Sequence, residues 1–254
     1  MDPNPANADA APAAPLPPKP GIGKRRAVFL DRDGTLIEHV HELVDPAAVR
    51  LVPGTGDGLA RLRDAGFLCI VVTNQPLLGR GRLDEAGLDR IHARLAELLA
   101  AEAPSARIDA FYACPVESGG AGPDVIEHPD RKPGPGLLLR AAREHGIDLA
   151  QSWMVGDSPR DVLAGRHADC RGTILLRSGV SGRNPAAPAG CDHVEATSPQ
   201  RRGSGRDARD LKLIGPTAAL RRAARRLTRR PRDGVAVEGA RGRGSCPSGS
   251  RTWK

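Results

Sequence analysis

The chain has 254 residues, enough for one sizeable hydrophobic core, and its 38 Lys and Arg against 30 Asp and Glu give a formal net charge of +8. No stretch is apolar for long enough to cross a membrane, and the Ala/Pro-rich start lacks the basic and apolar regions of a signal peptide. The five cysteines show neither disulfide nor metal spacing. These features exclude a membrane protein and a disulfide scaffold, and we expect a cytoplasmic protein.

Composition divides the chain into three parts. Residues 1–23 are expected to be a disordered leader, because Pro and small residues cannot build a core. Residues 24–198 alternate apolar and polar segments and are expected to form the folded domain. Residues 1–198 carry 22 Lys and Arg and 26 Asp and Glu, a net charge of −4, whereas residues 199–254 carry 16 and 4, a net charge of +12. We therefore expect residues 199–254 to be a basic, largely disordered tail, with a basic helix at 218–230.

The first expected strand, at residues 27–31, ends in two acids with one residue between them. Its apolar run is typical of a buried strand in a parallel sheet, and ligands of such sheets bind just beyond the carboxyl ends of the strands. Asp31 and Asp33 therefore lie at the usual place of chemistry, although Asp and Gly also form ordinary turns. Two close carboxylates repel each other and favour a divalent cation. One acid could then attack a phosphorus atom while the other moves protons.

Strands and helices alternate along the rest of the domain. The further strands are expected at 68–73, 109–113, 152–156 and 173–176, and the helices at 56–65, 84–102, 136–145 and 159–168. This alternation predicts an α/β fold, a doubly wound, Rossmann-like parallel sheet with helices on both faces and right-handed crossovers. The insertions at 38–52 and 115–130 are short. We therefore expect no large cap domain and a site open to small substrates.

Polar residues follow several of the expected strands and provide the functional groups that phosphoryl transfer needs. An anionic nucleophile that approaches a phosphate dianion needs positive charge between the two. Lys132, together with a magnesium ion on Asp31 and Asp157, would supply that charge, and magnesium prefers oxygen ligands. The Thr73 hydroxyl and the Asn74 amide could hold phosphate oxygens.

Four motifs, in this order, resemble those of the haloacid dehalogenase superfamily of phosphatases. They are Asp31-Arg32-Asp33-Gly34-Thr35, Thr73-Asn74-Gln75, Arg131-Lys132-Pro133 and Gly156-Asp157-Ser158-Pro159-Arg160-Asp161. The run Gly79-Arg80-Gly81 and the Arg-Lys-Pro-Gly-Pro-Gly run at 131–136 resemble the branch that contains D-glycero-D-manno-heptose 1,7-bisphosphate phosphatase and histidinol-phosphatase. The resemblance spans about residues 25–195.

The resemblance implies a role for each motif residue. Asp31 would be the nucleophile that forms an aspartyl-phosphate, and Asp33 would protonate the leaving oxygen and then activate water. Asp157 would bind magnesium together with Asp31 and the backbone carbonyl of Asp33. The substrate ligands would be Thr73 and Lys132 for the transferred phosphoryl group, and Arg131 and Asn74 for the rest of the molecule.

The chain departs from this branch in the loop before Arg131. Heptose bisphosphatases usually carry a zinc loop, with Cys-Pro-x-His upstream and Cys-x-Cys downstream. Here the upstream half reads Cys114-Pro115-Val116-Glu117, and His128 and Asp130 stand where the two downstream cysteines would be. Structural zinc sites need four ligands, mostly thiolate or imidazole. We expect a loop without zinc, and a Cys114/His128/Asp130 remnant is the alternative.

We interpret the chain as a magnesium-dependent phosphomonoester phosphatase that acts through an aspartyl-phosphate on a small sugar phosphate, with D-glycero-D-manno-heptose 1,7-bisphosphate as the first candidate. Histidinol phosphate is the alternative small substrate. A polynucleotide 3′-phosphatase is a second alternative, because those enzymes share the Asp-x-Asp-Gly-Thr, Thr-Asn-Gln and Lys-Pro elements. A non-catalytic binding protein of the same fold is a third, although every expected catalytic residue is present. By analogy with the branch we expect a monomer.

The basic segment at 199–254 has three interpretations. It could bind polyanions weakly and without specificity through charge alone. It could be a solvated extension without a dedicated partner, which we favour because Trp253 is its one aromatic residue and base stacking is not supported. A reading-frame change in a GC-rich gene is the third.

Overall fold

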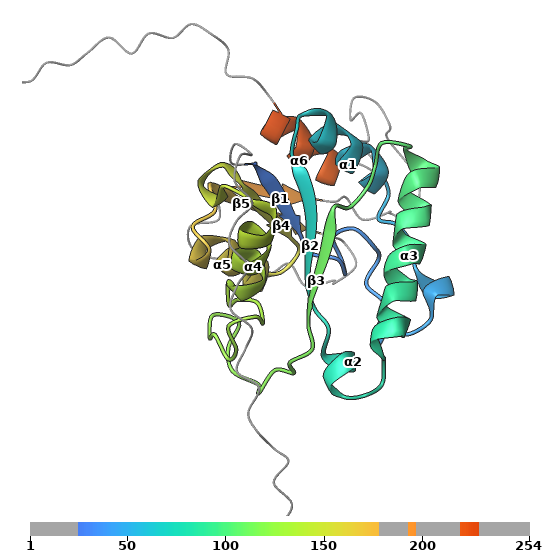
Figure 1. Ribbon diagram of the computed structural model, residues 1–254, viewed down its shortest axis with the longest axis vertical. Helices are drawn as coiled ribbons and strands as arrows, with labels where there is room; N and C mark the ends of the chain where they lie inside the picture. Colours follow the sequence, from blue (N-terminus) through green and yellow to red (C-terminus); the bar gives the residue numbers. More distant parts are fainter. Residues whose placement is uncertain (1–24, 178–192, 197–218, 229–254) are drawn as a thin grey trace, which may run out of the picture.

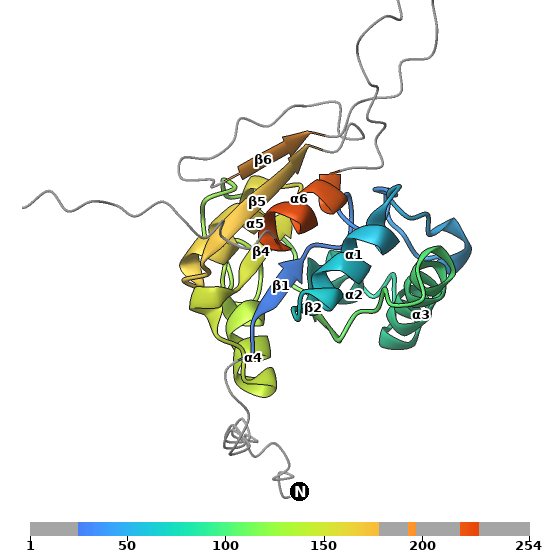
Figure 2. The same ribbon diagram turned by 90° about the horizontal axis from the view of Figure 1, so that it is seen from above.

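The computed structural model describes residues 25–177, 193–196 and 219–228. The expected leader, and the expected tail apart from residues 219–228, lie outside these residues. Within the described residues one parallel sheet has the strand order β3-β2-β1-β4-β5-β6 (Figures 1 and 2). Its strands are β1 Ala27–Leu30, β2 Leu68–Asn74, β3 Ala110–Cys114, β4 Trp153–Gly156, β5 Gly172–Arg177 and β6 His193–Ala196.

The central strand β1 is apolar throughout because both faces of the sheet are covered. Ala27 and Phe29 point into one core cluster, and Val28 and Leu30 point into the other. All four side chains have no exposed surface. Since successive side chains of a strand alternate between its two faces, this continuous run requires helices on both sides of the sheet.

Helices cover both faces, as Figure 2 shows from above. The first core cluster packs beneath α1 (Thr55–Asp64), α3 (Glu85–Glu102) and α6 (Ala219–Thr228). The second packs beneath α4 (Gly136–His145) and α5 (Pro159–His167). The described residues also form three short elements: η1 Pro46–Ala48, α2 Pro76–Gly79 and η2 Leu149–Gln151. The architecture is therefore a doubly wound α/β sandwich.

The expected fold class is confirmed. Each expected strand and each of the four expected domain helices begins and ends within one residue of its observed bounds. The strand β6 and the short helix α2 were not predicted. In the described part of the chain, the insertions at 38–52 and 115–130 hold only η1, turns and an isolated bridge, so neither forms a cap domain. Among these residues, no helix has the length and apolar character that a membrane span needs.

The helix expected at 218–230 is present as α6, but it packs in the domain. Leu220 is 4% exposed, and Ala223 and Ala224 have no exposed surface. These residues recur at helical spacing and form the apolar face that lies on α1 (Figures 1 and 2). At Gly58 of α1 an added Cβ would come within 2.9 Å of Leu220 Cγ, so the close approach uses the missing side chain. Residues 219–228 therefore belong to the folded domain, whereas the sequence assigned them to a tail.

Candidate active site

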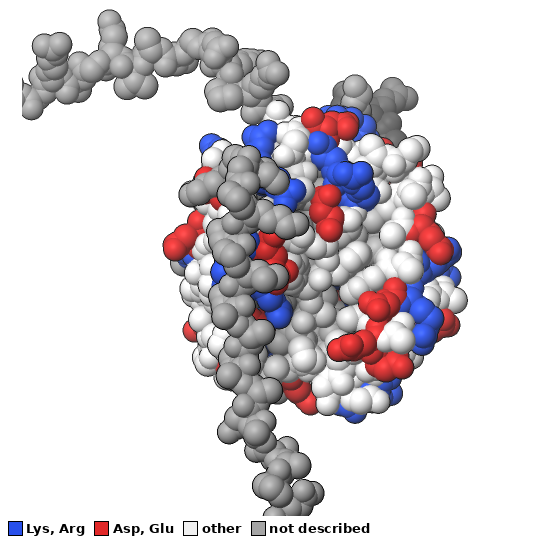
Figure 3. Space-filling model, viewed as in Figure 1, with Lys and Arg blue, Asp and Glu red and all other residues white. Residues whose placement is uncertain are grey.

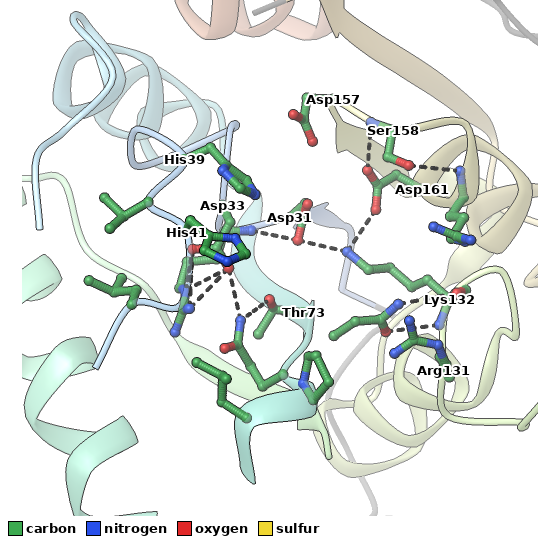
Figure 4. A pocket seen from close by; sticks show the side chains of 18 of the residues that line it. Asp31, Asp33, His39, His41, Thr73, Arg131, Lys132, Asp157, Ser158 and Asp161 are labelled. Carbon is green, nitrogen blue, oxygen red and sulfur yellow. Dashed lines mark hydrogen bonds and ion pairs between the residues drawn. The ribbon is translucent and has the colours of Figure 1, made fainter. Parts of the chain in front are cut away.

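A cavity of about 560 Å³ opens where β1, β2 and β4 end. The helices that follow β1 and β4 cover opposite faces of the sheet, and ligands bind at such switch points of doubly wound folds. All of the expected site residues line this one cavity, and Figure 4 shows most of them converging on it. They are Asp31, Asp33, Thr73, Asn74, Arg131, Lys132 and Asp157.

Asp31 follows β1 directly and is held from three sides. Its backbone N–H donates to the carbonyl of Val155 in β4 at 3.0 Å. Its Oδ1 accepts the backbone N–H of Arg32 at 2.8 Å and lies 2.7 Å from Lys132 Nζ. Burial raises the pKa of the Asp31 carboxyl well above its ordinary value, Lys132 opposes that rise, and the neighbouring carboxylates add to it. An ionised Asp31 therefore depends on nearby positive charge.

Lys132 is the buried cation of the site. Its ammonium group lies 2.7 Å from Asp31 Oδ1, 2.7 Å from Asp161 Oδ1, and donates to the carbonyl of Val72 at 2.9 Å. Burial alone would lower the pKa of Lys132, but Asp161 and Asp31 outweigh burial and raise it. The side chain is 3% exposed, so this charge is fixed at the floor of the cavity.

Asn74 holds the main chain of Lys132. Its Oδ1 accepts the Lys132 backbone N–H at 3.0 Å, and its Nδ2 donates to the Lys132 carbonyl at 3.1 Å. This two-bond clamp joins the end of β2 to the Gly/Pro-rich segment that carries the lysine. The sequence predicted a substrate contact for Asn74. It did not indicate the two observed hydrogen bonds, which position Lys132.

Three carboxylates gather beside Lys132. Oxygens of Asp31, Asp157 and Asp161 all lie within 4.8 Å of one another. Asp157 comes close because Gly34, at φ 80°, lies against it, and an added Cβ there would come within 2.1 Å of Asp157 Oδ2. A cluster made only of carboxylate oxygens fits a hard divalent cation such as magnesium. The Asp33 side chain takes no part in this cluster.

Asp161 was not among the expected site residues, although it belongs to the fourth motif. It is 1% exposed and closes the capping box of α5, because its Oδ2 accepts the backbone N–H of Ser158 at 3.0 Å. Its Oδ1 meets Lys132. The spacing Ser-x-x-Asp predicts the cap, whereas the ion pair joins segments far apart in the chain.

The Asp33 carboxylate turns to a different set of donors. It accepts from Arg32 through both oxygens and from Gln75 Nε2 at 2.8 Å. Gln75 Nε2 also donates to Thr73 Oγ1 at 2.8 Å, so one amide links the acid to the hydroxyl. The position of Gln75 next to the Thr-Asn pair was the only sequence signal for this residue.

Arg131 joins the cavity to the loop at 115–130. Its Nη1 donates to the carbonyl of Val116 at 2.6 Å, and its Nε lies 3.7 Å from Glu127 Oε2. Burial lowers the pKa of Arg131, and the charge of nearby Arg160 acts in the same direction. Two guanidinium groups therefore lie near each other at the rim, beyond the buried lysine.

Comparisons with known proteins agree with this geometry. Residues 130–197 match the model of the HAD-hydrolase-like family. A D-glycero-D-manno-heptose-1,7-bisphosphate 7-phosphatase of Thermosynechococcus vestitus is 42% identical over 169 residues, which cover 63% of this chain and 82% of the relative. The D-glycero-beta-D-manno-heptose-1,7-bisphosphate 7-phosphatase of Pasteurella multocida is 37% identical over 158 residues, 61% of this chain and 83% of the relative.

A solved structure of a protein with the same activity as these relatives also matches the fold. The D,D-heptose 1,7-bisphosphate phosphatase of B. bronchiseptica, complexed with magnesium and phosphate, superimposes with a TM-score of 0.60 at 26% identity. The match covers 79% of this chain and 99% of that protein. The chain is therefore a phosphomonoester hydrolase that belongs to the haloacid dehalogenase superfamily, in the branch of the heptose bisphosphate phosphatases.

Proposed function

We propose that this protein is a magnesium-dependent phosphatase that hydrolyses D-glycero-D-manno-heptose 1,7-bisphosphate through an aspartyl-phosphate on Asp31. The observation that carries the proposal is the placement of Asp31 at the switch point, 2.7 Å from the buried Lys132 and inside a cluster of carboxylates. Asp31 and Asp157 would hold the magnesium ion, together with the backbone carbonyl of Asp33. The bound ion would neutralise negative charge on the phosphoryl group as it is transferred.

Two carboxylates divide the reaction between them. An Asp31 oxygen attacks phosphorus, the bond from phosphorus to the sugar oxygen breaks, and Asp33 gives its proton to that oxygen. Asp33 then takes a proton from water, which attacks the phosphorus of the aspartyl-phosphate and releases inorganic phosphate from Asp31. Lys132 and the Thr73 hydroxyl hold the phosphoryl oxygens in both steps.

The rim of the cavity supports a substrate with a second anionic group. Arg131 and Arg160 line the cavity outside the set that holds the reacting phosphoryl group, whereas Arg80, which also lines it, is paired with Glu42 and Glu117. A bisphosphate can place its second phosphate on such guanidinium groups, which bind phosphate through their planar forks. Histidinol phosphate has no second phosphate, and the rest of that molecule carries an amine and an imidazole. This positive rim therefore favours the bisphosphate, in agreement with the names of the relatives.

A loop without zinc completes the proposal. Glu127 takes the central place in this loop, since its carboxylate accepts from Ser118 Oγ at 2.9 Å and from the Ala121 backbone N–H at 3.0 Å. The residues at the expected zinc positions have other partners. His128 Nδ1 accepts the Asp130 backbone N–H at 3.1 Å, and Asp130 lies 3.4 Å from Arg140. Hydrogen bonds to Glu127 can thus hold this loop without a metal ion.

A phosphate-release screen tests the proposal. Purified protein would be incubated with the heptose bisphosphate, histidinol phosphate and a 3′-phosphorylated oligonucleotide, each with magnesium and with a chelator. We expect the highest kcat/KM for the heptose bisphosphate and no release without magnesium. Fastest release from the oligonucleotide would replace the sugar-phosphate assignment, and no release from any substrate would refute the activity.

A further inference from the structure

Arg32 lies between the two catalytic acids in sequence, yet its side chain is only 1% exposed. Its Nε and Nη2 contact both oxygens of Asp33 at 2.9–3.2 Å. A guanidinium that binds a carboxylate through two nitrogens fixes the orientation of the carboxylate as well as its distance. Because a buried charge is tolerated only when it is matched, the natural role for Arg32 is to hold Asp33.

His92 lies on the other side of this guanidinium. Its Nε2 is 3.4 Å from Arg32 Nη1, and its ring stacks on Phe111 with centroids 4.1 Å apart. Burial lowers the pKa of His92 to about 4, and the charge of Arg32 acts in the same direction. A neutral imidazole can accept from Arg32 without adding a second negative charge. Asp33 is therefore the charged partner of Arg32, because the neutral His92 carries no negative charge that would compete for the guanidinium.

Gln75 contacts Asp33 from the cavity side and is 4% exposed. Its Nε2 donates to Asp33 Oδ2 at 2.8 Å and to Thr73 Oγ1 at 2.8 Å, which uses both amide hydrogens. Since Thr73 Oγ1 accepts from Gln75, its own hydrogen is free to point elsewhere. The hydroxyl can then act as a donor to a phosphoryl oxygen. One amide thus orients both the acid and a phosphate ligand.

We propose that Arg32, Gln75 and His92 are positioning residues of the phosphatase reaction. Arg32, backed by His92, and Gln75 hold the Asp33 carboxylate in the orientation that serves the leaving oxygen and the attacking water. Gln75 also sets the donor direction of Thr73. This inference rests on the proposed function, in which Asp33 is the acid and base.

The test compares two leaving groups. A sugar oxygen must be protonated as it leaves, whereas p-nitrophenolate leaves readily without a proton. Loss of acid catalysis therefore lowers kcat/KM for the heptose bisphosphate more than kcat/KM for p-nitrophenyl phosphate. A general structural defect, or a displaced Thr73, lowers both values by the same factor. The ratio of the two values thus isolates the positioning of Asp33.

Gln75→Met keeps the length of the side chain and removes both donors. We expect the ratio to fall about tenfold or more, a part of the roughly 10²–10⁴-fold worth of general acid–base catalysis. Gln151→Met is the matched control, because Gln151 in η2 donates to Asp148 at 3.0 Å, away from the cavity. This control should leave the ratio unchanged. Arg32→Lys keeps the buried charge without the fork, and we expect the same fall in the ratio.

A pair of variants at His92 extends the test. His92→Leu removes the acceptor near Arg32 and should lower the ratio of the two kcat/KM values. His92→Gln retains a neutral acceptor there and should keep the ratio close to that of the wild type. An unchanged ratio in both Gln75→Met and Arg32→Lys, with each variant shown to be folded by its thermal transition, would overturn the inference while leaving the phosphatase activity intact. A wild-type protein that releases phosphate from neither substrate would refute the proposed function and this inference with it.

Discussion

Replacing Asp31, the proposed nucleophile, should both stop turnover and stabilise the metal-free protein. Asp31→Asn keeps an acceptor for the Arg32 backbone N–H but removes a buried carboxylate whose pKa is raised well above its ordinary value by burial. Lys132 keeps Asp161 and the Val72 carbonyl, so no buried cation is left without a partner. Turnover should fall by on the order of 10³ or more, because the covalent step is lost.

The pH dependence of the gain follows from the direction of the pKa shift. The folded protein holds the Asp31 proton more tightly than the unfolded chain, whose reference value is 3.8. Asp31 therefore costs no stability below that value, and the cost grows as the pH rises to the raised pKa and then stays constant. A difference of one between the folded and the unfolded pKa of a group corresponds to about 1.4 kcal/mol. At pH 7 we expect Asp31→Asn to gain on the order of 1 kcal/mol or more in the free energy of unfolding.

Denaturant unfolding measures this gain, with a chelator present and then with magnesium. Magnesium at 100 times its Kd raises the free energy of unfolding by about 2.7 kcal/mol. This increase should be larger for the wild type than for Asp31→Asn, because the variant lacks one magnesium ligand. The stability advantage of Asp31→Asn should then shrink. Asp124→Asn, which changes an exposed loop acid, is the control and should change neither value. A metal-free Asp31→Asn protein less stable than the wild type at pH 7 would refute the reasoning.

Three further predictions follow from the site and its surroundings. Asp33→Asn should slow turnover roughly 10²–10⁴-fold while magnesium affinity is kept, because the expected ligand there is a backbone carbonyl, and metal titration followed by kinetics at saturating magnesium checks this. Purified protein should hold far less than one zinc per chain, and stoichiometric zinc by elemental analysis would point to a site at Cys114, His128 and Asp130. Ending the chain after Ser198 should lower the free energy of unfolding, by an amount comparable to the roughly 2–5 kcal/mol of a Leu to Ala core change, because Leu220 and its neighbours leave the surface of α1.

The regular elements of the domain could be predicted because their signals are local. In α3, Leu88, Ile91, Leu95 and Leu99 recur at helical spacing, and all are buried. The side chain of Asp84 caps its first turn by accepting the Gly87 backbone N–H at 2.7 Å. The strands are short apolar runs bounded by turns. Such patterns specify the type and limits of an element from a few neighbouring residues.

The packing partner of a helix could not be predicted in the same way, as α6 illustrates. Its helical character was predicted, and the spacing of Leu220, Ala223 and Ala224 already marked one apolar face. The sequence interpretation rested on the basic charge of the segment and assigned the helix to a tail. Its partner α1 lies more than a hundred residues earlier in the chain, so no local pattern shows that the two helices meet.

The candidate site shows the same division. Motif order was enough to name the residues that line one cavity. The contacts among them were not predicted, because Lys132 meets Asp31 and Asp161 through segments that converge only in the folded sheet. The two hydrogen bonds of the Asn74 amide to the Lys132 backbone also depend on this convergence. The same holds for the hydrogen bond of Gln75 to Asp33, which accompanies its hydrogen bond to Thr73. Sequence thus predicted the inventory, and the fold determines which side chains are ligands and which position other side chains.

The charges of the site explain why such a protein would need a divalent ion in addition to its lysine. Asp31, Asp157 and Asp161 bring three negative charges to one place, and Lys132 returns one positive charge, which leaves a formal charge of −2. Arg32 cannot relieve this excess because it is paired with Asp33. A phosphate dianion would be repelled from such a site, whereas a divalent cation balances it. The burial that makes Asp31 costly to ionise therefore also makes the folded protein favour the divalent ion that the proposed reaction uses.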